Sequence, residues 1–209
     1  MSEFKEMTYG EKYDAILGYT KIVENFAPKL VKAELGEQKL AELENLWKQG
    51  IVPIPKDASD KDRYEVAYRN FMWKWVSAND FMGKHQGEVG TSKYMHAAIA
   101  KWKRKYAFSS IPLKIVRGVS KKTAFAALSK RLAYQLQAFS PFTVSEFTER
   151  RMVLEVTPCK ILENPNGSSF CSMACQNIIP SWLQAQFNLN MNLNRHGTDC
   201  KVVFEPFGT

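Results

Sequence analysis

The first 158 residues contain no cysteine, and all four cysteines of the 209-residue chain lie in its last 51 residues. Glycine and proline are scarce, with 11 and 9 residues, which excludes a collagen-like chain. No apolar run reaches the ~18 residues that a membrane-spanning helix needs. The N-terminus also lacks the basic start and the apolar stretch of a secretory signal. We therefore expect a cytoplasmic protein that does not enter a membrane.

Acidic residues are missing from one long segment. Residues 101–131 hold ten lysines and arginines and no aspartate or glutamate, whereas the whole chain has a net charge of +8. Such a concentrated basic segment attracts anions over a long range. A small anionic ligand or an acidic protein partner would suit it, and a solvated helix face is an equal alternative. No zinc-finger, homeodomain or RNA-recognition motif accompanies it, which disfavours nucleic acid as a partner.

The first two-thirds of the sequence is predicted to be helical. Apolar residues recur with a helical period over residues 9–26, 40–47 and 60–81, and the aromatic stripe of the last range is expected to be core. We expect Pro28 to restart the first helix and Gly36 to cap its end.

Glycines then interrupt the helical pattern. Gly83, Gly87 and Gly90 are expected to break the chain before a further helix over residues 91–106. Another amphipathic pattern begins at Ser120 and ends before a proline. The two predicted helices therefore flank the middle of the basic segment, one on each side.

The last third changes character. Residues 142–147 and 152–156 look extended, and residues 171–184 suit a short helix. From residue 187 to 194, apolar side chains alternate strictly with asparagine, which is typical of a strand with one buried face. A glycine-containing turn then leads to a partner strand over residues 200–204, which completes a hairpin.

These elements predict an α+β fold, in which a helical N-terminal two-thirds precedes a small antiparallel sheet with a packed helix. The division falls between a mainly helical region over residues 1–140 and a cysteine-containing α+β unit over residues 141–209. The length suits one integrated domain.

Side chains with metal-ligating or nucleophilic chemistry gather in the predicted α+β unit. Cys171 and Cys175 are four residues apart, so on a helix both thiols share one face. His196 and Cys200 have the same spacing around the hairpin turn. If the helix packs on the hairpin, three thiols and one imidazole form a tetrahedral site for zinc or a soft site for iron. The spacing lacks the C-x₂-C pair typical of zinc sites, so other hypotheses stay open.

The same residues also suit nucleophilic catalysis or plain packing. Cys175 or Cys171 near a helix start would have a lowered pKa. His196 would act as the base, and Asp199 would orient its imidazole. A free cysteine also behaves as a small hydrophobe, which fits Cys200 at the start of an apolar strand best.

Three short segments resemble one known C-terminal pattern. They are Val156–Cys159, Cys171–Cys175 and Asn194–Phe204. In that pattern a strand ends in cysteine, a helix begins with cysteine, and an arginine-containing strand leads to glycine, a polar pair, cysteine and phenylalanine. The segments resemble the L-2-amino-thiazoline-4-carboxylic acid hydrolase-like family and an adjoining family of unknown function. A more distant resemblance is to the vinyl-4-reductase type of small-molecule-binding domain.

The resemblance implies a small hydrolase that acts on a C=N or amide-type bond of a small anionic substrate. The helical cysteine pair would attack and the histidine would move a proton. Arg195, or Lys114 and Arg117 of the basic segment, would hold a carboxylate of the substrate. Cys159 would be either a resolving thiol or a buried residue. The alternative is a non-catalytic small-molecule- or metal-binding module that docks on a larger enzyme through its basic face.

Overall fold

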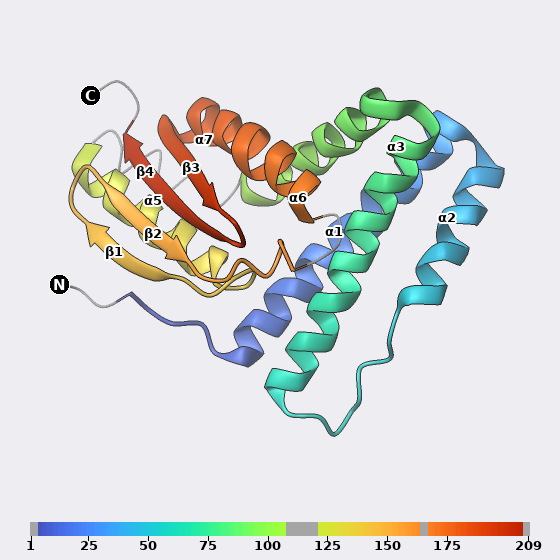
Figure 1. The fold of residues 1–209 in the computed structure, drawn as a ribbon, viewed down its shortest axis with the longest axis horizontal. Helices are drawn as coiled ribbons and strands as arrows, with labels where there is room; N and C mark the ends of the chain where they lie inside the picture. The colour runs from blue at the N-terminus through green and yellow to red at the C-terminus, as the bar shows by residue number, and fades with distance from the viewer. Residues whose placement is uncertain (1–3, 108–120, 164–166, 207–209) are drawn as a thin grey trace. The chain divides into compact units, whose positions relative to one another are not determined.

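The computed structural model describes residues 4–107, 121–163 and 167–206 and confirms the predicted α+β fold (Figure 1). The chain divides into two compact units. The helical unit is Thr8–Trp102, and the sheet unit is Lys103–Thr209 together with the N-terminal segment Met1–Met7. The division between these units lies near residue 102, whereas the predicted change from mainly helical to α+β character lies between residues 140 and 141. No helix among the described residues is long and apolar enough to cross a membrane.

The helical unit contains α1 (Tyr9–Leu35), α2 (Glu37–Gly50) and most of α3 (Asp60–Ala107). A capping box begins α1, because the Thr8 hydroxyl accepts from the Glu11 backbone N–H while the Glu11 carboxylate accepts from the Thr8 N–H. Pro28 lies inside α1 and does not restart it, so that prediction is wrong. A proline removes one backbone hydrogen bond of the helix. Val31 in the next turn is fully buried, and this burial stabilises the helix beyond the proline. Gly36 ends α1 as predicted, with φ +89°.

One glycine of the predicted three bends α3. Gly87 has φ +62° and ψ −147°, a conformation that residues with a Cβ adopt only with strain. Gly83 and Gly90 instead stay helical on either side of the bend. A Cβ at Gly90 would overlap the backbone carbonyl of Met82, so this glycine permits the close approach of two helical segments.

An aromatic core between α1 and α3 holds the helical unit together. Trp75 is 1% exposed and lies at its centre. Its ring centroid lies 6.2 Å from that of Phe26, 5.9 Å from Phe71 and 5.7 Å from Tyr94. The aromatic stripe is therefore core, as expected.

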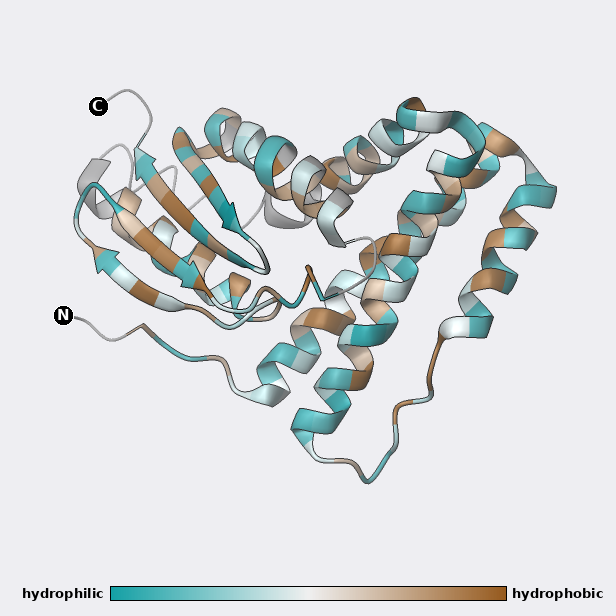
Figure 2. Cartoon of the chain, in the orientation of Figure 1, coloured by the Kyte–Doolittle hydropathy of each residue, from teal (hydrophilic) through white to brown (hydrophobic). Residues whose placement is uncertain are grey.

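The sheet unit contains helices and strands in an order that matches the prediction. They are α5 (Lys121–Leu136), β1 (Thr143–Phe147), β2 (Met152–Val156), α6 (Gly167–Phe170), a π-helix (Cys171–Ile178), α7 (Ile179–Phe187), β3 (Leu189–His196) and β4 (Asp199–Pro206). The sheet is antiparallel with the order β1-β2-β4-β3. The predicted hairpin is confirmed, and the alternation of hydrophobic and hydrophilic residues along β3 is visible in Figure 2.

Two packing features position the site. α7 packs against β3, and α5 contacts β4, which is why α5 belongs to the sheet unit. The central strands β2 and β4 carry the core, with Leu154 at 0% and Phe204 at 1% exposure. At the outer strand β1, the pairing with β2 shifts between Val144 and Glu146, which marks a β-bulge.

Candidate functional site

Cys159 lies in the turn that follows β2. Its backbone N–H donates to the Thr198 carbonyl at 2.9 Å, and its own carbonyl accepts from the Leu162 N–H at 2.9 Å. The Ser140 hydroxyl donates to the Cys159 sulfur at 3.6 Å and accepts from the Lys160 N–H at 3.0 Å. These bonds fix the Cys159 side chain beside the start of β4.

Cys200 lies opposite the end of β2, because it pairs with Val156 in the sheet register. Its thiol lies near enough to the Cys159 sulfur to favour the thiolate form of Cys159. Both cysteines are free, and each is 8% exposed. The two thus form a buried dithiol between β4 and the turn after β2.

Cys171 and Cys175 form a second pair on the π-helix, as their spacing predicted, and each thiol acts on the pKa of the other. Arg195 of β3 lies close enough for its charge to act on Cys171. Its Nε donates to the Gly197 carbonyl at 2.8 Å, and its Nη1 donates to the Ser168 hydroxyl at 2.7 Å. Arg195 therefore links the tip of the hairpin to α6, so the predicted contact between the helix and the hairpin is present.

In each pair, the pKa of one thiol is lowered and the pKa of the other is raised. The hydrogen bond from Cys200, aided by Ser140 and two backbone N–H groups, lowers the pKa of Cys159 to about 6. The hydrogen bond from Cys175 and the charge of Arg195 lower the pKa of Cys171 to about 7. The pKa values of Cys175 and Cys200 are raised, because each donates to its neighbour's sulfur and is withdrawn from water. Cys159 and Cys171 are therefore the more acidic thiols of their pairs.

The four thiols act on one another across the two pairs. A charge on Cys159 raises the pKa values of Cys171, Cys175 and Cys200. We call these four residues the cysteine cluster. The pKa directions favour Cys171 over Cys175 as a nucleophile and leave Cys175 as a proton donor.

The predicted Cys–His–Asp arrangement is not assembled. His196 lies exposed at the end of β3, opposite Asp199 in the register. Within the described ranges, no hydrogen bond joins His196 to Asp199 or to any residue of the cysteine cluster. Asp199 instead accepts from the Thr198 hydroxyl at 3.5 Å. Among the described hydrogen bonds, none orients the imidazole towards Asp199 or a thiol.

The predicted metal site also lacks its geometry. The described part of the chain holds no group of three histidine, cysteine, aspartate or glutamate side chains arranged to hold a metal ion. Among the described residues, the set of Cys171, Cys175, His196 and Cys200 does not form such a group. Zinc or iron at these residues stays a prediction that metal analysis of the purified protein would test.

Of the residues predicted to hold an anion, Lys114 and Arg117 lie outside the described residues. Ser140 was not identified from the sequence, although it is 6% exposed and contacts Cys159. A lone serine before a proline carries no signal of a contact with a sulfur 19 positions away.

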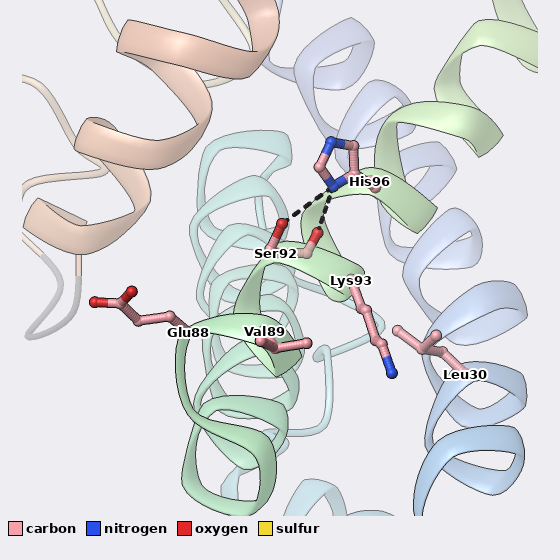
Figure 3. A pocket seen from close by; sticks show the side chains of 6 residues that line it. All are labelled: Leu30, Glu88, Val89, Ser92, Lys93 and His96. Atoms are coloured by element: carbon pink, nitrogen blue, oxygen red, sulfur yellow. Dashed lines mark hydrogen bonds between the residues drawn. The ribbon is translucent and has the colours of Figure 1, made fainter.

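A separate open pocket of about 540 Å³ lies in the helical unit. Its lining residues are Leu30, Glu88, Val89, Ser92, Lys93 and His96 (Figure 3). His96 Nδ1 lies 2.9 Å from the Ser92 carbonyl, and Lys93 pairs with Glu34, whose pKa is lowered by that contact. Figure 3 shows the Glu88 side chain pointing away from Lys93 and His96. The polar groups do not converge, so the cysteine cluster is the stronger candidate.

Replacing Cys200 with alanine is expected to raise the pKa of Cys159 from about 6 towards the ordinary value of 9.0, because the main stabilising hydrogen bond is lost. The ultraviolet absorbance of the thiolate, followed across pH, measures the change. A Cys175→Ala variant is the control, since it removes the partner of Cys171 and keeps that of Cys159. An unchanged acidic transition in Cys200→Ala would contradict the assignment.

The same shifts predict how stability depends on pH. The pKa values of Cys159 and Cys171 are lower in the folded chain than the ordinary 9.0, so the folded state binds fewer protons between about pH 6 and 9. These two thiols therefore contribute stability above pH 9 that is lost as the pH falls towards 6.

Comparisons with known proteins add no function. No protein-family model matches the sequence. No curated protein matches it. One solved structure, the Fe(II) unliganded H-NOX protein from K. algicida, aligns over 91% of this chain and 97% of its own, with 11% identity and a TM-score of 0.36. A similarity of that size carries no argument about function.

Proposed function

We propose that the sheet unit is a hydrolase-like module in which the Cys171 thiolate attacks a C=N or amide-type carbon of a small anionic substrate. The observation that carries the proposal is the arrangement of Cys171, Cys175 and Arg195. It combines a thiolate, a neighbouring thiol that retains its proton and a guanidinium in one place.

Arg195 supports an anionic substrate. An arginine has five N–H donors, and the contacts with Gly197 and Ser168 occupy two of its nitrogens. The side chain is exposed, so the remaining donors are able to bind a carboxylate. The two protein contacts hold the guanidinium in a fixed orientation, which reduces the entropy lost when a substrate binds.

The chemistry follows from the two thiols. The sulfur of Cys171 forms a bond to the electrophilic carbon, and the electron pair of the C=N bond moves to nitrogen. That nitrogen takes the proton of Cys175. The C=N bond then re-forms as the bond from this carbon to its leaving group breaks; in a thiazoline the leaving group is the ring sulfur. Water adds to the carbon and returns a proton to Cys175. The adduct collapses to a C=O bond, which releases the Cys171 thiolate and passes the hydroxyl proton to the leaving group. His196 has no role in these steps.

The test uses L-2-amino-thiazoline-4-carboxylate as substrate. We expect ring opening by the wild-type protein, no activity above background in Cys171→Ala and a loss of about 10²-fold in Cys175→Ala, the size of a general-acid contribution. An Arg195→Gln variant should raise KM more than it lowers kcat. The control is Cys200→Ala, which belongs to the other pair. Turnover that persists in Cys171→Ala would refute the proposal, and so would binding of this substrate without turnover.

A further inference from the structure

We propose that Cys159 and Cys200 form a redox-active dithiol that closes to a disulfide by exchange with a low-molecular-weight disulfide. This inference does not depend on the proposed hydrolysis, which uses the other pair. It gives the protein a second chemistry, with small disulfides and their thiols as co-substrates.

The geometry brings the two sulfurs together from different parts of the sheet unit. The Cys159 N–H donates to the carbonyl of Thr198 at 2.9 Å, two residues before Cys200. Cys200 is held in β4 by its pairing with Val156, three residues before Cys159. The two backbones are therefore fixed beside each other, and the Cys200 thiol acts on the acidity of Cys159.

The Cys171–Cys175 pair is less suited to the same reaction. Both cysteines lie on one helical segment, so its backbone sets the distance between their Cβ atoms, whereas a disulfide needs ~3.5–4.5 Å between them. Closing that bond would distort the helical turn. Cys159 and Cys200 lie on separate segments, so no helical spacing holds their sulfurs apart.

The reaction proceeds in two exchange steps. The Cys159 thiolate attacks one sulfur of the small disulfide, whose S–S bond breaks, and one thiolate leaves with the electron pair. Cys200 then gives its proton to solvent and attacks the Cys159 sulfur, which releases the second thiolate. The two protein thiols are oxidised to one disulfide, and the small disulfide is reduced to two thiols. Because both cysteines are nearly buried, a small co-reactant suits the site better than a protein disulfide.

The new bond would join the end of β2 to the start of β4. It would close the loop from residue 159 to residue 200, which includes the π-helix and β3. Loop closure restricts the unfolded chain, so the oxidised protein should unfold at a higher denaturant concentration than the reduced protein.

The experiment equilibrates the full-length protein in glutathione buffers of graded redox ratio, traps free thiols by alkylation and maps the products by mass spectrometry. We expect a Cys159–Cys200 disulfide with the loss of two hydrogen atoms, while Cys171 and Cys175 remain alkylated. In Cys200→Ala the glutathione adduct should accumulate on Cys159, because the resolving thiol is missing. In Cys159→Ala no adduct should form on Cys200.

Serine variants at both positions repeat the test where alanine impairs folding, and circular dichroism verifies the fold of each variant. Cys175→Ala is the matched control and should close the disulfide as the wild type does. Oxidation confined to Cys171 and Cys175 would overturn the proposal. So would a folded Cys200→Ala protein without a Cys159 adduct, or free thiols at Cys159 and Cys200 in the most oxidising buffer.

Discussion

A methyl group at Gly167 is expected to destabilise the sheet unit by about 3 kcal/mol, the upper part of the usual range for overpacking. A Cβ at this position would overlap the backbone carbonyl of Ile161, which no side-chain rotation relieves. Either the turn after β2 or the start of α6 must move. The turn carries Cys159, and α6 leads directly into Cys171, so the substitution disturbs both thiol pairs.

Denaturant unfolding of Gly167→Ala measures the loss of stability, and the thiolate absorbance reports the disturbance of the cysteine cluster. Ser172→Ala is the matched control, because Ser172 lies on the following turn with its side chain exposed. That variant should differ from the wild type by less than about 0.5 kcal/mol. Equal stability of Gly167→Ala and the wild type would show that the close approach to Ile161 does not exist.

Trp75→Ala is expected to destabilise the helical unit by about 3–5 kcal/mol, since it removes a buried aromatic side chain and leaves a cavity. The lost contacts include those with Phe26, Phe71 and Tyr94. A loss of that size is comparable to the whole stability of many domains. Chemical unfolding followed by tryptophan fluorescence of the remaining residues measures it.

Tyr94→Phe in the same core should have the opposite effect. The Tyr94 hydroxyl is buried, and it forms no hydrogen bond with any described residue. A buried polar group without a partner costs about 1–3 kcal/mol, so its removal should leave stability unchanged or raise it by about 1 kcal/mol. A large loss in Tyr94→Phe would mean that the hydroxyl has a partner, such as an ordered water molecule.

The fold was predictable where local pattern decides structure. The alternation of apolar and asparagine residues over 189–194 predicted β3, and the β-branched run over 152–156 predicted β2. The consequences of Pro28 and of the α3 glycines were not predictable, because they depend on packing partners. Pro28 lies inside a helix among buried neighbours. Gly90 is needed because a side chain there would overlap the Met82 backbone.

The site was predictable in part. The four-residue spacing placed Cys171 and Cys175 together, since both lie on one helical turn. The acidity of Cys159 depends on Cys200 and Ser140, which are distant in sequence, so no local motif indicates it. The exposed position of His196 was not predictable either, because it follows from the continuation of β3 to this residue at the hairpin end.

The division into two units near residue 102 was also not predictable from local pattern. The amphipathic pattern of α5 identifies a helix but not the surface that its apolar face covers. That surface belongs to the sheet, because α5 contacts β4. Topology and not periodicity therefore decides which unit a helix joins.

The bulge in β1 also makes this strand less able to pair with a strand of another molecule. β1 is an outer strand, and an outer strand offers unpaired backbone groups to a strand of another molecule. The register shift between Val144 and Glu146 interrupts the regular spacing of those groups. Glu146 adds a charge paired with Arg151 at 3.2 Å, and the ring of Phe4 covers Phe147 at 5.0 Å. This edge of the sheet is consequently a poor template for fibril growth.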